Sequence, residues 1–169
     1  LKDDKIVSEK AYSESILTLN YLIGIKKLQG ISVSSVNKDG SRKLYPLQKL
    51  FSANAKPKFV VRYNQIGCNT CVNLLFKNKE LLGQLSKKFE IIVLVDFQNY
   101  QDYIVWKKIS EIETGIYWLE KGKLPFDLRF EENSYCFIMN NELLTSSYFM
   151  PNNQFPSRVT KYVNDITRS

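Results

Sequence analysis

The chain has 169 residues, of which 44% are hydrophobic and 24% charged, and this composition excludes a disordered protein. Its net charge is +7, but the basic residues are scattered in small clusters, so we expect a solvated basic surface and no nucleic-acid partner. Attraction to an anionic membrane surface or to an acidic partner stays open. Histidine is absent, which excludes a Cys-His or Ser-His catalytic pair and any histidine metal ligand.

Hydrophobic periodicity and turn residues predict a helix and then a hairpin in the first third of the chain. Apolar residues at spacings of three and four predict a helix over residues 8–29, which Gly30 ends. Residues 31–36 and 42–47 read as two strands joined by an Asn-Lys-Asp-Gly turn at residues 37–40.

Strands and helices are then expected to alternate. The predicted elements are a short helix at 47–53, a strand at 58–63, a helix at 68–88 that Gly83 interrupts, a strand at 91–95, a helix at 99–112, a short strand or connector at 116–120, two strands at 135–139 and 143–149, and a helix at 156–167. Strands separated by a helix pair in parallel through a right-handed crossover, whereas the last two strands are close enough for a hairpin. The order predicts an α/β fold with a mixed sheet and helices on both faces.

The stretch Cys68-Asn69-Thr70-Cys71 lies between a predicted strand and a predicted helix. The first turn of a helix has free N–H groups and a partial positive charge, which favour a thiolate at Cys68. Cys71 sits one turn further along, within bonding reach. The pattern therefore predicts a redox dithiol. The alternatives are two ordinary cysteines or a structural disulfide, although so short a loop gains little from a disulfide.

This element order, with Cys-x-x-Cys just after the first core strand, resembles the thioredoxin fold. The turn at residues 36–40, the segment 44–47 and the strand 58–63 are together similar to the opening of TlpA-like thioredoxins. The resemblance implies a three-layer α/β/α, thioredoxin-like domain at residues 31–169, preceded by an N-terminal helical extension at residues 1–30.

The same resemblance implies an activity and a location. TlpA-like proteins are typically exported or tethered thiol–disulfide oxidoreductases, so we expect a periplasmic protein, or one anchored to the membrane and facing the periplasm, of a bacterial envelope. Any export signal or anchor would lie upstream of Leu1. Cys68 is implied as the attacking cysteine and Cys71 as the resolving one. The expected partners are a protein thiol or disulfide substrate and a recycling reductase, and no metal or organic cofactor is needed.

Three positions depart from the family pattern. Gly67 stands where the family usually has Trp before the first cysteine. Residues 132–136 contain no proline where the family has a cis-proline loop. Arg62 occupies the place of a buried acid. It is either an exposed or snorkelling arginine on an edge of the sheet, or its charge supports the thiolate.

Other residues are expected to support the site or the core. In thioredoxin-like proteins the two residues between the cysteines set the reduction potential of the pair, and here these residues are Asn69 and Thr70. Ser134 and Tyr135 are either ordinary strand entry or a replacement for the substrate-facing loop. Cys136 is either a small buried hydrophobe or a third thiol near the dithiol. Two further expectations are that Asp96 caps a loop or helix and that both tryptophans, Trp106 and Trp118, contribute packing.

Two other function classes stay open at this point. The first is a binding module on a thioredoxin scaffold, because fold does not guarantee function. The second is a thiol peroxidase, which needs a Pro…Thr-x-x-Cys pocket. Here Thr70 directly precedes Cys71, and Pro57 lies before the core strand.

Overall fold

A computed structural model describes residues 2–51 and 55–168. Its helices are α1 (Lys2–Ile23), α2 (Asn69–Phe76), α3 (Lys79–Ser86), α4 (Tyr100–Ile109) and α5 (Pro156–Thr167), with 3-10 helices η1 (Leu47–Leu50) and η2 (Asp127–Phe130). The strands are β1 (Lys26–Lys27), β2 (Ser32–Val36), β3 (Arg42–Pro46), β4 (Lys58–Tyr63), β5 (Glu90–Val95), β6 (Gly115–Trp118), β7 (Tyr135–Met139) and β8 (Leu144–Phe149).

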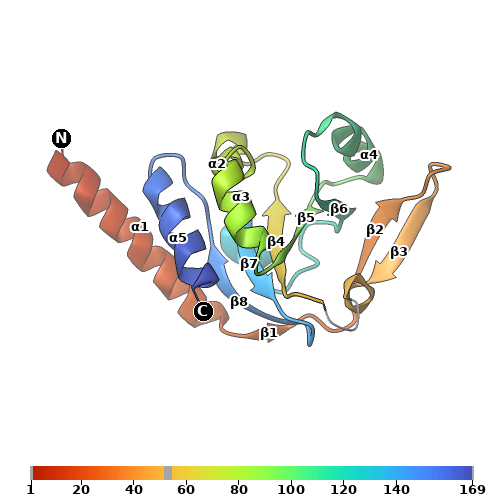
Figure 1. Ribbon diagram of the computed structural model, residues 1–169, viewed down its shortest axis with the longest axis horizontal. Helices are drawn as coiled ribbons and strands as arrows, with labels where there is room; N and C mark the ends of the chain where they lie inside the picture. The colour runs from red at the N-terminus through yellow and green to blue at the C-terminus, as the bar shows by residue number, and fades with distance from the viewer. Residues whose placement is uncertain (1, 52–54, 169) are drawn as a thin grey trace.

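In the described part of the chain, eight strands form one mixed sheet in the order β1-β8-β7-β4-β5-β6-β2-β3. β4 runs parallel to β5 and antiparallel to β7, and β5 runs parallel to β6. Figure 1 shows α1 beyond one end of this sheet and the β2–β3 hairpin at the other. All six residues of β4 are buried, because this central strand has neighbours on both edges and layers on both faces.

The two faces of the sheet pack against different layers. On one face, β4 contributes Phe59, Val61 and Tyr63 to a core that includes buried residues of all five helices, among them Tyr12, Val72, Leu85, Tyr103 and Val163. The other face carries a core of β-strand residues covered by η1, η2 and the end of α1, which supply Leu47, Phe130 and Ile23. Because the side chains of a strand alternate between faces, neighbouring residues of β4 belong to different cores.

The start of α2 lies where the chain leaves β4, so the Cys-x-x-Cys stretch stands at one end of the central strands. β4, β7 and α5 have the predicted bounds, and the predicted hairpin is present as β2 and β3. The mixed α/β architecture confirms the predicted fold class. The face opposite α2 is covered by η1, η2 and the end of α1, so it carries short 3-10 helices where a second layer of α-helices was expected.

The prediction of one helix over residues 68–88 placed its interruption at the wrong residue. Gly83 lies inside α3, and the break falls between α2 and α3, where Asn78 is the N-cap of α3. The Asn78 Oδ1 accepts a hydrogen bond of 3.1 Å from the backbone N–H of Leu81. A side-chain cap of this kind satisfies an otherwise free N–H of the first turn, so it starts a new helix more effectively than a glycine ends the old one.

The other boundaries differ less. The first helix begins at Lys2 and ends at Ile23, not at residue 29, because Gly24 takes a positive φ of 64° and turns the chain into β1. The short helix predicted at 47–53 ends as η1 at Leu50, and its residues 52–54 lie outside the described part of the chain. The helix predicted at 99–112 ends at Ile109.

The first 30 residues are joined closely to the rest of the fold. Tyr12 of α1 packs against Phe155 with ring centroids 5.4 Å apart. The side chain of Asn20 exchanges two hydrogen bonds with the backbone of Tyr148, and β1 pairs with β8. A domain boundary at residue 30 stays a proposal. None of the described helices combines the length and apolarity needed to cross a membrane.

Candidate active site at the start of helix α2

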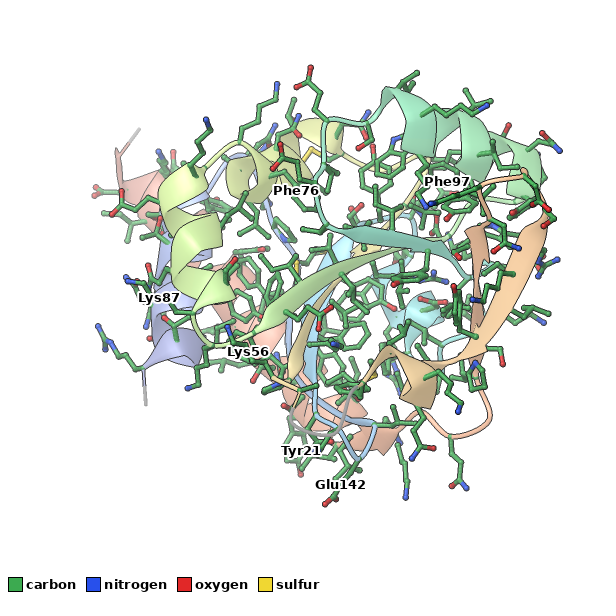
Figure 2. All side chains as sticks on the ribbon, turned by 45° about the vertical axis from the view of Figure 1, so that its right-hand side comes forward. Tyr21, Lys56, Phe76, Lys87, Phe97 and Glu142 are labelled. Carbon is green, nitrogen blue, oxygen red and sulfur yellow. A yellow bond between two sulfur atoms is a disulfide. The ribbon has the colours of Figure 1, made fainter. Side chains whose placement is uncertain are left out.

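The structure brings Cys68 and Cys71 together at the start of a helix, as their spacing predicts. Cys68 is the N-cap residue of α2 and Cys71 lies in its first turn. Their Cα atoms are 5.3 Å apart and their sulfur atoms form a disulfide, drawn in yellow beside α2 in Figure 2. The backbone N–H of Cys71 points at the Cys68 Sγ at 3.2 Å. An amide dipole is therefore already aimed at the atom that would carry the negative charge.

The two sulfurs differ in access. Cys68 is half-buried, whereas Cys71 is only 8% exposed. A reagent or substrate approaching from solvent therefore meets Cys68 first. This asymmetry suits an attacking cysteine at Cys68 and a resolving cysteine at Cys71, the roles that the resemblance implies.

A buried polar network holds the loop that precedes Cys68. The Asp96 carboxylate accepts hydrogen bonds from the Asn64 side chain at 2.7 Å and from the Gln65 backbone at 3.1 Å. The Ser134 Oγ accepts one from the Asn64 backbone at 2.9 Å, and Asn64 Oδ1 accepts one from the Ile66 backbone at 2.9 Å. Together these contacts fix where the loop delivers Cys68.

Asp96 and Ser134 thus belong to the loop support. Asp96 caps a loop, as predicted, and burial raises the pKa of its carboxyl although the nearby Arg62 charge lowers it in part. Ser134 is buried, and it reaches the loop through its hydroxyl. Asn64 was missed by sequence analysis, because an isolated asparagine after a strand carries no motif.

Gly67 is in close contact with the segment that stands in place of the cis-proline loop. A Cβ at this position would lie 2.8 Å from the Glu132 carbonyl oxygen and 3.3 Å from the Asn64 side chain. Side-chain Cβ atoms essentially never lie 2.8 Å from another heavy atom, and the Glu132 oxygen belongs to the backbone, so it cannot simply rotate away. Glycine is therefore required by close packing here, and the tryptophan expected from the family has no room.

Asn69 and Thr70 each make one specific contact. The Tyr63 hydroxyl donates a hydrogen bond to Asn69 Oδ1 at 2.5 Å. The Thr70 Oγ1 lies 3.2 Å from the Cys68 Sγ and accepts a 3.0 Å hydrogen bond from the Asn153 side chain. Asn153 comes from the segment between β8 and α5, so a residue 83 positions away reaches the dithiol. Sequence analysis did not identify it.

Arg62 makes a buried ion pair on the other face of the sheet. Its guanidinium, 1% exposed, donates to both carboxylate oxygens of Asp127 at 3.0 and 2.8 Å. It also donates to the carbonyls of Leu119 and Glu120. Burial acts to raise the pKa of Asp127, but the hydrogen bonds and charge of Arg62 outweigh burial and hold it below its ordinary value. The interpretation of Arg62 as an exposed arginine on a sheet edge is therefore wrong, because β4 is a central strand and the side chain is buried. Support of the Cys68 thiolate by Arg62 stays a prediction.

Tyr135 belongs to the same network as Arg62. Its hydroxyl donates to Asp127 at 2.5 Å, and its ring stacks on Phe130 with centroids 3.8 Å apart. Burial raises the pKa of Tyr135 well above its ordinary value. The side chain of Tyr135 thus lies in the core opposite α2, so Ser134 is the member of this predicted pair that supports the loop before Cys68.

Cys136 is a free, buried cysteine in the helix-facing core. It is 2% exposed, and burial raises the pKa of its thiol. These properties fit the prediction of a small buried hydrophobe. Trp106 and Trp118 pack as predicted: the Trp106 ring lies 4.7 Å from that of Tyr63, and Trp118 donates to the Phe97 carbonyl at 2.8 Å.

No protein-family model and no curated protein matches this sequence. Among solved structures, the chain is similar to an uncharacterized thioredoxin-like protein from Porphyromonas gingivalis, with a TM-score of 0.55 and 17% identity over 84% of this chain and 94% of that one. It is also similar to a protein assigned as the thiol:disulfide interchange protein DsbE from Chlorobium tepidum, with a TM-score of 0.53 and 11% identity over 82% and 94% of the two chains.

A third likeness is to the mitochondrial 2-Cys peroxiredoxin from Plasmodium falciparum, with a TM-score of 0.52 and 11% identity over 83% of this chain and 92% of that one. Sequence identities this low support a conclusion about the fold only. The sheet order, the Cys-x-x-Cys pair at the start of α2 and these likenesses show that the chain has a thioredoxin-like fold.

Proposed function

We propose that the protein is a thiol–disulfide oxidoreductase whose working group is the Cys68–Cys71 dithiol. One observation carries the proposal: the more accessible sulfur caps a helix, receives a backbone N–H, and lies within bonding distance of a less exposed partner. A thiolate at that position is stabilised in the reduced protein, and the partner can take over any bond that it forms.

The chemistry proceeds in two exchanges. The Cys68 thiolate attacks one sulfur of a substrate disulfide, forms a mixed disulfide and releases the other substrate sulfur as a thiolate. Cys71 then loses its proton and attacks the Cys68 Sγ, which closes the Cys68–Cys71 bond and releases the second substrate sulfur. Two electrons pass from the dithiol to the substrate. One proton on the substrate thiols comes from Cys71, and the other comes from solvent, to which Cys68 lost its proton on forming the thiolate. A thiol reductant must restore the dithiol.

The partners and the compartment belong to the proposal. A protein thiol or disulfide is the substrate class, and a separate reductase recycles the site. The likeness to a DsbE protein supports a place in the bacterial envelope, because proteins of that name act in thiol–disulfide interchange. Disulfide exchange suits such an oxidising compartment.

A turnover assay with variants tests the activity. The reduced protein is expected to reduce the insulin disulfides in the presence of dithiothreitol, and Cys68→Ser is expected to abolish this. Cys71→Ser is expected to accumulate the mixed disulfide with its substrate, because the resolving sulfur is gone. Cys136→Ser is the matched control and retains full activity. Turnover by Cys68→Ser at the rate of the unaltered protein would contradict the proposal.

A binding module on the same scaffold is the second candidate. The close approach of the Glu132 carbonyl to Gly67 favours it, since both the residue before Cys68 and the segment that replaces the cis-proline loop depart from the family pattern. A module of this kind would retain its fold in Cys68→Ser, reduce no insulin and show an ordinary thiol pKa of about 8.5 at Cys68. A peroxide-consumption assay separates both candidates from a thiol peroxidase.

A further inference from the structure

Asn153 connects the segment before α5 to the dithiol through one hydroxyl. Its Nδ2 lies 3.0 Å from the Thr70 Oγ1, and that oxygen lies 3.2 Å from the Cys68 Sγ. The same sulfur receives the Cys71 N–H at 3.2 Å. The Cys68 sulfur thus has a backbone group and a side-chain hydroxyl around it, and a third residue holds the hydroxyl.

Hydrogen-bond chemistry gives this chain of contacts a direction. An amide NH₂ group can only donate, so Thr70 Oγ1 accepts from Asn153. A hydroxyl has one proton, and it stays available for another acceptor. The sulfur of a disulfide carries no proton, so the contact between Thr70 and Cys68 has the hydroxyl as its donor.

We propose that Asn153 is a positioning residue that turns the Thr70 hydroxyl proton toward the Cys68 sulfur. In the reduced protein two donors, the Thr70 hydroxyl and the Cys71 N–H, then face the thiolate. Hydrogen bonds to a charged acceptor are stronger than those to a neutral one, so the thiolate gains more than the disulfide. Asn153 thereby lowers the pKa of Cys68 and favours the dithiol over the disulfide.

This inference rests on the proposed function for its effect on turnover, but its own readouts are two properties of the cysteine pair. They are the pKa of Cys68, from the pH dependence of its alkylation, and the equilibrium constant of the dithiol with glutathione. Asn153→Ala is expected to raise that pKa by about half to one unit, and to shift the equilibrium roughly three- to tenfold toward the disulfide.

Three further variants make the test specific. Asn153→Asp keeps the shape of the side chain but presents an acceptor, which draws the Thr70 proton away from the sulfur and raises the pKa of Cys68 further. Thr70→Val removes the hydroxyl, so Asn153→Ala should have no additional effect in that background. Gln154→Ala is the matched control, because Gln154 has a similar amide one position along the same exposed segment, and it should change neither quantity.

Because Asn153 is exposed, its variants should fold, and a change in the pKa of Cys68 can be attributed to the lost contact with Thr70. A Cys68 pKa that is unchanged or lowered in Asn153→Ala would overturn the inference. So would an equal shift in the Thr70→Val background, because Asn153 would then act by another route. Failure of the proposed function is recognised differently, by the absence of insulin reduction in the unaltered protein, whatever the variants of Asn153 do.

Discussion

Arg62 and Asp127 form a buried, bidentate ion pair between the central strand β4 and η2. The side chains are 1% and 3% exposed, and the remaining Arg62 donors reach backbone carbonyls. Every charge in this cluster has a partner, which is the condition under which a buried pair is tolerated. The pair fastens η2 and the segment before β7 to the sheet face that α2 does not cover.

Removing one partner of this pair should destabilise the fold strongly. Arg62→Met leaves the Asp127 carboxylate buried without its cation, which typically costs about 3–5 kcal/mol in the free energy of unfolding. The double variant Arg62→Met with Asp127→Leu should recover much of that loss, because no buried charge is left. Urea unfolding measures both.

The exposed pair between Lys161 and Asp165 provides the control for that experiment. Lys161→Met should change the free energy of unfolding by less than about 1 kcal/mol. An Arg62→Met protein as stable as Lys161→Met would show that the buried pair contributes little. The Cys68 pKa of Arg62→Met, if it still folds, also tests whether this arginine supports the thiolate.

The Arg62–Asp127 pair also predicts a pH dependence of stability. The pKa of Asp127 is lowered in the folded protein, so its contribution is present above the unfolded pKa of about 3.9 and is lost as the pH falls through the folded pKa. The stability advantage over the double variant at Arg62 and Asp127 should therefore be constant near neutral pH and shrink below about pH 4. Urea unfolding from pH 7 to pH 2 measures it, and an advantage that grows in acid would contradict the assignment.

Gly67 should tolerate no side chain. Gly67→Ala places a Cβ against the Glu132 carbonyl, so backbone must move, at a cost of about 1–3 kcal/mol in the free energy of unfolding. Gly83→Ala is the matched control, because its new Cβ meets nothing within 4 Å and alanine favours a helix by about 1 kcal/mol over glycine. Thermal unfolding of both variants tests this prediction. Equal melting temperatures would mean that the Glu132 backbone moves aside at no cost in stability, and would contradict it.

Ser134 should matter for the loop that carries Cys68. Ser134→Ala removes the acceptor of the buried Asn64 N–H and leaves that group unsatisfied, which costs about 1–3 kcal/mol. Ser134→Thr keeps the hydroxyl and should retain the hydrogen bond. Hydrogen exchange at the Asn64 amide reports the loss directly, and protection that is equal in the alanine and threonine variants would rule out this role.

Local patterns were enough to predict what local forces determine. The apolar run of β4, the apolar strand β7 and the proline that starts α5 gave correct bounds, because burial and backbone geometry act within a few residues. The two cysteines meet for the same reason, since three residues of helix bring their Cα atoms to 5.3 Å. The break at Asn78 was missed because a cap and a helix-interior glycine compete, and the cap prevailed.

Tertiary contacts account for the rest of the site. Asp127 and Asn153 reach Arg62 and Thr70 from 65 and 83 residues away, and the topology of the sheet brings them there. The sequence-based interpretation of Arg62 in the apolar strand β4 considered charge support for the thiolate, and it did not predict a buried acid as the partner of this arginine. Glu132 acts through its backbone carbonyl, which no side-chain pattern reveals.

The pH dependence of Cys68 alkylation in the reduced protein tests the central claim most directly. With the modified cysteines identified by peptide mass spectrometry, we predict that Cys68 reacts before Cys71 and follows an apparent pKa of about 7 or below. An apparent pKa near about 8.5, or faster modification of Cys71, would show that the start of α2 does not activate Cys68.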